Sequence, residues 1–226
     1  MAHPVLCRVR TSYTGMCYAA HTTGRRSYLT AYGEDERIAD AEGRGVDMTG
    51  DVDGLTVRDA SDDERAALRA VTLAAYEEYA TVMPALAWAR YQRRLLDTLD
   101  ADAAVERIVA ARGGTIVGGV LLYPPAANIY AGAVAGVDWP EVRLLAVAPA
   151  ERGHGVGAAL MDECIRRARA RGAAYLGLHT MDVMRSAVRM YERMGFVRAP
   201  ELDFSPAEGV LVRGYRRGLG DVPPAV

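Results

Sequence analysis

Residues 147–172 read VAPAERGHGVGAALMDECIRRARARG and place Gly153, Gly155 and Gly157 directly before a helical pattern. Backbone N–H groups at glycines can face outward with no Cβ in the way, and the start of a helix favours negative charge. Such glycines could also serve only a tight turn from strand to helix. Because three glycines within five positions exceed what a turn needs, we expect an anion-binding loop.

The residues after this loop have the spacing of an amphipathic helix. The apolar residues that share one face are Leu160, Cys164, Ile165 and Ala168. Gly172 is placed to end the helix. Apolar strand patterns lie on either side, at 141–147 and 173–180. The sequence therefore predicts a strand, a glycine loop, a helix and a second strand in this order.

Helix and strand patterns continue in both directions from this unit. Ser61 followed by Glu64 has the spacing of a capping box, and Pro84 separates the helix that begins there from a second one. The predicted strands cover residues 55–60, 106–111, 115–123, 141–147, 173–180, 196–199 and 209–217. The predicted helices cover residues 61–80, 85–100, the segment from the glycine loop to Gly172, and 184–194.

The composition excludes several classes of protein. The chain has 226 residues and a formal net charge of −2, so it lacks the basic surplus of nucleic-acid-binding proteins. No run approaches the roughly 18 apolar residues of a membrane span. Its 27 basic residues include no lysine, which excludes a lysine nucleophile and the phosphate loop that ends in Lys-Ser/Thr. We expect a protein that binds neither nucleic acid nor membrane.

Cysteine and histidine usage argues against disulfide and metal sites. Cys7, Cys17 and Cys164 form no CxxC pair, and an odd number of cysteines does not suit a disulfide framework. The four histidines show neither HxxxH nor HxH spacing. We therefore expect no metal site and a reducing, cytoplasmic location.

The chain divides by pattern into three segments. Residues 1–53 lack helical or strand periodicity and are rich in Gly, Thr, Ser and Asp, so we expect a disordered N-terminal extension. A related hypothesis is that Met48 is the actual translation start. Residues 54–219 are expected to form one domain, followed by a short tail at 220–226.

The glycine loop also satisfies a dinucleotide-binding pattern, GxGxxA, through Gly153, Gly155 and Ala158. That pattern normally follows the first strand of its fold, whereas here it comes about two thirds of the way along the chain. The acidic residue expected about twenty positions later has only Asp182 as a late candidate. An NAD(P)-binding enzyme is therefore an alternative interpretation.

Written as Arg-x-x-Gly-x-Gly, residues 152–157 resemble the loop of the GNAT superfamily of acyl-CoA-dependent N-acyltransferases. LLAVAPAERGHGVGAALM resembles that family's strand, pyrophosphate loop and helix, and AVRMYERMGF resembles its downstream helix with the Tyr and Gly-Phe signature. The resemblance extends over roughly residues 55–217. It implies an α/β (α+β) fold with a mixed, mostly antiparallel central sheet and flanking helices, in which the strands RLLAV and AYLGLHT splay apart.

The resemblance implies acetyl-CoA as co-substrate, bound without a metal. The pyrophosphate would accept hydrogen bonds from the N–H groups of the glycine loop, and the pantetheine arm would bond to backbone groups freed between the splayed strands. The implied cofactor-binding residues are Leu145, Val147, Arg152, Gly153, His154, Gly155, Val156, Gly157 and Ala158.

The resemblance also implies roles in proton transfer. Tyr191 stands where the family places its general acid, and a phenol with an ordinary pKa of about 10 is protonated at neutral pH. A tyrosine packed in the core is the other interpretation. Glu141, eleven positions before Arg152, is the candidate base, and His179 is the alternative. Met184 departs from the pattern, since many relatives carry Asn seven residues before the tyrosine.

The implied function is direct transfer of an acetyl (acyl) group to a primary amine on a small molecule or peptide, and a homodimer is considered. Met184 motivates a second hypothesis, a non-catalytic acyl-CoA-binding domain. The first two helices commonly line the acceptor side in this family, and here they carry aromatic residues that suit a packed core equally well. These residues are Tyr76, Tyr79, Trp88 and Tyr91.

Overall fold

The computed structural model describes residues 54–101, 105–125, 137–207 and 210–220. The expected extension at 1–53, the Met48 hypothesis and nearly all of the tail lie outside these residues. The strands are β1 Leu55–Asp59, β2 Glu106–Arg112, β3 Thr115–Tyr123, β4 Glu141–Val147, β5 Tyr175–Thr180, β6 Val197–Arg198, β7 Phe204–Ala207 and β8 Val210–Gly218. The α-helices are α1 Arg65–Tyr76, α2 Ala85–Asp100, α3 Val156–Ala170 and α4 Arg185–Arg193.

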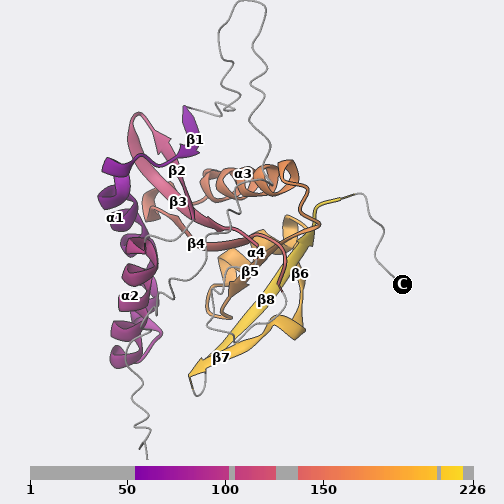
Figure 1. Ribbon diagram of the computed structural model, residues 1–226. Helices are drawn as coiled ribbons and strands as arrows, with labels where there is room; N and C mark the ends of the chain where they lie inside the picture. Colours follow the sequence, from indigo (N-terminus) through magenta and orange to yellow (C-terminus); the bar gives the residue numbers. More distant parts are fainter. Residues whose placement is uncertain (1–53, 102–104, 126–136, 208–209, 221–226) are drawn as a thin grey trace, which may run out of the picture. The chain divides into compact units, whose positions relative to one another are not determined.

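The strands form one eight-stranded mixed sheet. Seven of them lie in the order β1-β2-β3-β4-β5-β8-β6, and β7 pairs with β8. Every pairing is antiparallel except that of β4 with β5, which is parallel. The predicted fold class, a mostly antiparallel sheet with flanking helices, is confirmed (Figure 1).

The parallel pair β4 and β5 separates after two residues. The pairing consists of Glu141 with Gly177 and Val142 with Leu178, and the rest of β4 has no β5 partner among the described residues. The predicted splay is therefore confirmed. Backbone groups on this edge of β4 are left available between the two strands.

Two adjacent glycines in β3 allow helices to approach the sheet from both sides. A Cβ on Gly118 would lie 2.9 Å from Val156 Cγ1 of α3, and a Cβ on Gly119 would collide with Leu68 of α1. Because successive strand residues point to opposite faces, α3 covers one face and α1 the other. The helix α2 packs on the same side as α1, since Leu99 joins Leu68 in one buried cluster (Figure 1).

The helix predicted at 61–80 is divided in the structure. A short 3₁₀ turn (Asp62–Glu64) precedes α1, and a second one (Glu77–Thr81) follows it. The predicted capping box is present, because the Ser61 N–H donates to the Glu64 carboxylate at 2.9 Å. Strand β7 was not predicted, since residues 204–207 contain Pro206 and lack a clear alternation of apolar and polar residues. No helix in the described ranges is both long and apolar enough to cross a membrane.

Candidate active site

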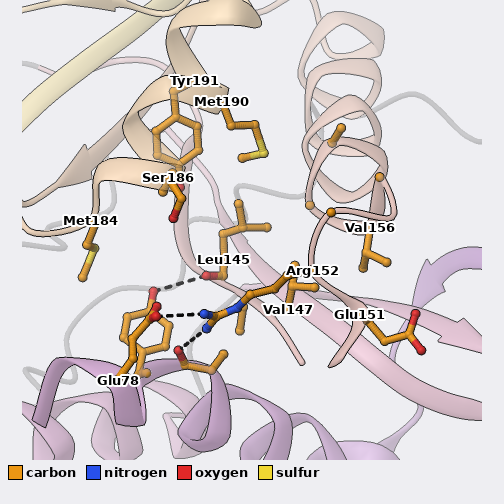
Figure 2. Close-up of a pocket in the computed structure, with 18 of the residues that line it drawn as sticks. Glu78, Leu145, Val147, Glu151, Arg152, Val156, Met184, Ser186, Met190 and Tyr191 are labelled. Atoms are coloured by element: carbon orange, nitrogen blue, oxygen red, sulfur yellow. Dashed lines mark hydrogen bonds and ion pairs between the residues drawn. The ribbon is translucent and has the colours of Figure 1, made fainter. Parts of the chain in front are cut away.

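A cavity of about 450 Å³ lies beside the part of β4 that has separated from β5 (Figure 2). Its walls come from the end of α1 and the turn after it, the second half of β4, the glycine loop, and α4. The lining residues used below are Tyr76, Glu78, Tyr79, Leu145, Ala146, Val147, Glu151, Arg152, Gly153, Gly155, Val156, Gly157, Ala158, Met184, Ser186, Ala187, Met190, Tyr191 and Arg193. Elements from both sides of the sheet thus meet at one cavity.

The glycine loop has the backbone conformation that an anion site requires. Gly153 and Gly155 adopt φ angles of 81° and 78°, a left-handed region that costs a residue with a Cβ about 1–2 kcal/mol. Gly155 is also the N-cap of α3, so the first N–H groups of that helix point toward the cavity side of the loop. The loop thus offers several N–H donors and the positive end of a helix dipole.

A β-bulge interrupts β4 next to the cavity. Leu144 has φ 52° and is the only non-glycine residue with a positive φ in the described part of the chain. The pairing of β4 with β3 shifts register at the same place, between Gly119 and Leu121. Backbone strain of this kind costs about 1–3 kcal/mol and collects at functional sites. It redirects the backbone of Leu145 and the residues that follow it along the cavity, which no feature of the sequence had predicted.

Arg152 lines the cavity, but its guanidinium is directed toward α1. Its two terminal nitrogens donate to the Glu78 carboxylate and to the Ala75 carbonyl, each at 2.8 Å (Figure 2). The side chain therefore ties the glycine loop to the end of α1, and Glu78 neutralises its charge. An anion at the loop would therefore meet backbone N–H groups rather than this guanidinium.

Tyr191 extends from α4 into the cavity wall and is 7% exposed. Burial raises the pKa of its hydroxyl above the ordinary value of 10, and the nearby Tyr79 hydroxyl adds to the effect. The ring also packs against Phe196, with centroids 5.9 Å apart. The ring therefore packs in the core, as one interpretation expected, and Tyr191 also lines the cavity, while its role as a general acid stays a prediction.

Three more tyrosines gather on the α1 side of the cavity. The Tyr76 ring lies 5.7 Å from Tyr79 and 6.1 Å from Tyr91, and its hydroxyl donates a long hydrogen bond of 3.4 Å to the Leu145 carbonyl. Burial raises the pKa of Tyr79 to about 12. Tyr76 and Tyr79 line the cavity, whereas Tyr91 packs behind them against Trp88. Of the aromatic residues that the first two helices carry, Tyr76 and Tyr79 therefore line the cavity, whereas Trp88 and Tyr91 do not.

The structure brings Glu141 and His179, the two candidates for the base, into contact. His179 Nδ1 lies 3.2 Å from the Glu141 carboxylate, and Nε2 lies 2.9 Å from the Leu202 carbonyl. A carbonyl only accepts, so Nε2 carries a hydrogen, and the contact with Glu141 then needs one shared proton. Neither residue is among those that line the cavity. Glu141 shares its strand face with Arg143, whose charge acts on the Tyr76 hydroxyl, so both face the α1 side.

Met184 lies at the N-terminus of α4, is 8% exposed and lines the cavity. Its sulfur accepts a hydrogen bond from the Thr180 hydroxyl at 3.6 Å. A thioether can accept only weakly and cannot donate, so this position lacks the amide donor that an asparagine would provide.

The predicted loop residues line the cavity except His154, which is exposed and is not among the lining residues. Sequence reasoning missed four lining residues on α4, namely Ser186, Ala187, Met190 and Arg193. The spacing of four and three residues between Ser186, Met190 and Arg193 places these three on one helical face, which is the signal that could have identified them. In the described ranges no group of three His, Cys, Asp or Glu side chains could hold a metal ion.

Comparisons with known proteins agree with this fold. The family model for the acetyltransferase (GNAT) family matches residues 72–196. No match was found among curated protein sequences.

Solved structures similar to the chain share its fold. A GNAT-family acetyltransferase from Staphylococcus aureus Mu50 has a TM-score of 0.56 and 17% identity, covering 74% of this chain and 99% of that one. A GNAT-family acetyltransferase from Brucella melitensis, solved with acetyl-CoA, has a TM-score of 0.51 and 22% identity, covering 75% and 91%. The ribosomal-protein-S18-alanine N-acetyltransferase from Escherichia coli has a TM-score of 0.53 and 15% identity, covering 76% and 98%.

Proposed function

Since the chain belongs to the GNAT family of acetyltransferases, we propose that it transfers the acetyl group of acetyl-CoA directly to the nitrogen of a primary amine. The observation that carries the proposal is that the glycine loop, the unpaired edge of β4 and the Tyr191 hydroxyl all border one cavity. Phosphate, amide and thioester groups of one extended molecule would meet matching partners there. The amine acceptor is argued from the chemistry of the site and from the Escherichia coli relative, which acts on an alanine amine.

The residues present fit acetyl-CoA. The loop offers N–H donors for the pyrophosphate, and β4 from Leu144 to Val147, which has no β5 partner among the described residues, would meet the amides of the pantetheine arm. The cavity of about 450 Å³ falls within the usual range for ligand sites, about 300–1,000 Å³. The bound molecule would supply an activated acyl group whose carbonyl is open to attack by an amine.

The backbone of β4 would stabilise negative charge at the acyl oxygen. The bulge at Leu144 turns the peptide groups that follow it out of the regular ladder, and Leu145, Ala146 and Val147 line the cavity. An N–H fixed in this way by the fold needs no reorganisation when charge develops, and such donors contribute about 2.7–4 kcal/mol to catalysis.

Tyr191 would donate its proton to the departing thiolate. Burial raises the pKa of the hydroxyl, which keeps the acid form populated across the neutral range. A positioned general acid of this kind contributes about 10²–10⁴-fold in rate.

Glu141 would accept the proton that the incoming ammonium releases, and His179 would hold the carboxylate in position through the 3.2 Å contact at Nδ1. Both residues lie on the α1 side of the sheet, where the acceptor would enter. Because neither residue lines the cavity, the proton would travel through an intervening water or through the acceptor's own groups.

Incubation with acetyl-CoA and a panel of amines, followed by mass spectrometry of the products, tests the proposal. The panel should contain polyamines, amino acids, aminoglycosides and peptides with free N-termini. We expect acetylated product and free CoA in equal amounts for at least one class, and much less product with Tyr191→Phe. Binding of acetyl-CoA with no product across the panel would favour the non-catalytic acyl-CoA-binding domain instead. Cytoplasmic location and a homodimer stay predictions.

A further inference from the structure

The charged side chains that line the cavity differ in whether they have partners. Glu78 pairs with Arg152 at 2.8 Å, and Glu151 lies 3.3 Å from Arg112. Arg193 also lines the cavity, is exposed, and has no ion pair or hydrogen bond from its side chain among the described residues. Its guanidinium is therefore an uncompensated positive charge at the cavity rim.

The position of Arg193 relative to the glycine loop follows from its neighbour Met190. The Met190 sulfur lies 3.3 Å from the point where a Cβ on Gly157 would stand, so α4 contacts the first turn of α3 at this place. Figure 2 shows Met190 projecting from α4 on the cavity side. Arg193 follows three residues later on the same helical face, about 4.5 Å further along the axis. The backbone of Arg193 thus lies nearly one helical turn further along α4 than the residue that contacts Gly157.

The phosphates of CoA would have different partners. The loop N–H groups suit the pyrophosphate, and Arg152 is held by Glu78 and the Ala75 carbonyl. CoA carries a third phosphate on its ribose, a monoester with a charge of about −1.5 to −2 at neutral pH. That phosphate lies beyond the pyrophosphate, at the outer end of the molecule, which is where an exposed arginine on the rim is placed to meet it.

We propose, building on the proposed function, that Arg193 binds the ribose 3′-phosphate and makes the site select CoA over 3′-dephospho-CoA. The residue acts on cofactor selection and not on the acyl transfer itself. Arg189, one turn earlier on α4, provides a matched control, because it is also exposed and without a partner in the described ranges but does not line the cavity.

Calorimetric titration with CoA and with 3′-dephospho-CoA tests this assignment without requiring catalysis. We expect the wild type to bind CoA about tenfold more tightly, the size of one charge-assisted hydrogen bond. In Arg193→Gln this preference should fall to less than about twofold, with the affinity for 3′-dephospho-CoA unchanged. Arg193→Lys should retain part of the preference and Arg189→Gln nearly all of it, and added salt should weaken it in the wild type.

Three results would overturn the assignment while leaving the proposed function intact. The first is a full preference for CoA in Arg193→Gln. The second is an equal loss of affinity for both ligands, which would place Arg193 on the pyrophosphate. The third is an equal loss of preference in Arg189→Gln, which would indicate a general field effect of the helix. Failure of the wild type to bind either ligand would instead overturn the proposed function, and the assignment with it.

Discussion

Tyr191 differs from an ordinary surface tyrosine in the surroundings of its hydroxyl. It is 7% exposed, and burial, together with nearby hydroxyls and Cys164, raises its pKa. We predict that Tyr191→Phe lowers kcat by about 10²-fold because the leaving thiolate loses its proton donor. The affinity for acetyl-CoA should change less than about twofold. Steady-state kinetics combined with a binding titration checks both values, and an unchanged kcat would remove the assigned role.

Glu78 controls the charge that Arg152 can present to the cavity. The pair is partly exposed, with side-chain exposures of 45% and 40%, so it contributes at most about 1 kcal/mol to folding. We predict that Glu78→Gln tightens acetyl-CoA binding several-fold, because the Arg152 guanidinium is then free to face the phosphates. The gain should shrink above about 0.5 M salt. Titrations at two salt concentrations measure it, and weaker binding would show that Glu78 itself positions the loop.

At the level of elements, Arg167 connects α3 to the first two strands. It donates to Glu163 at 2.7 Å and to Glu106 at 2.9 Å, and also to Asp59. With a side-chain exposure of 13%, it is the most buried member of this network, so Arg167→Met should cost about 1–3 kcal/mol in the free energy of unfolding. Arg166→Met is the control, because Arg166 is 67% exposed and pairs with no residue other than Glu163 in the part of the chain that the structure describes. Urea denaturation of both variants tests this comparison, and equal losses would contradict it.

The same network makes stability depend on pH in a defined direction. Burial alone would raise the pKa of Glu106 and Glu163, but hydrogen bonds from arginines outweigh it and lower the pKa of both below 4.5. Groups with a lowered pKa stabilise the fold fully above the ordinary value and lose this effect as pH falls through the lowered one. The urea midpoint of the wild type should therefore fall below about pH 4.5, and less steeply in Arg167→Met. Parallel slopes would contradict this account.

The close approach of α1 to β3 depends on Gly119. A Cβ there collides with Leu68, whereas a Cβ on Gly218 in β8 meets nothing within 4 Å. We predict that Gly119→Ala destabilises the protein by about 1–3 kcal/mol through overpacking, and that Gly218→Ala changes stability by less than about 0.5 kcal/mol. Thermal unfolding of the two variants provides the measurement. Equal stability would mean that α1 can move aside at little cost.

The elements differ in how far the sequence predicts them. The loop and α3 are predictable because glycines at special φ angles and one apolar face leave few alternatives, and the splay of β4 follows from the family resemblance. The bulge at Leu144 has no such signal, since a leucine in an apolar strand normally adopts a negative φ. The pairing of Glu141 with His179 is also not local, because it depends on the register of β4 against β5.

At the scale of the whole molecule, the buried clusters on the two faces of the sheet both reach the gap between β4 and β5. Tyr191 belongs to the buried cluster around α3, whereas Tyr76 and Met184 belong to a cluster on the α1 side. The cavity is lined by members of both clusters. A ligand in the gap would therefore replace the backbone pairing that the splayed strands lack, and it should stabilise the entire fold rather than one loop.

Thermal unfolding with acetyl-CoA, and separately with NAD(P), tests the central claim most directly. A ligand at about 100 times its dissociation constant adds about 2.7 kcal/mol to the free energy of unfolding, which for a chain of this size raises Tm by about 5–10 °C. We predict this shift with acetyl-CoA, a smaller one in Gly155→Ala, whose φ of 78° strains the substituted loop, and none with NAD(P). A shift with NAD(P) and none with acetyl-CoA would assign the glycine loop to a dinucleotide and contradict the acetyltransferase account.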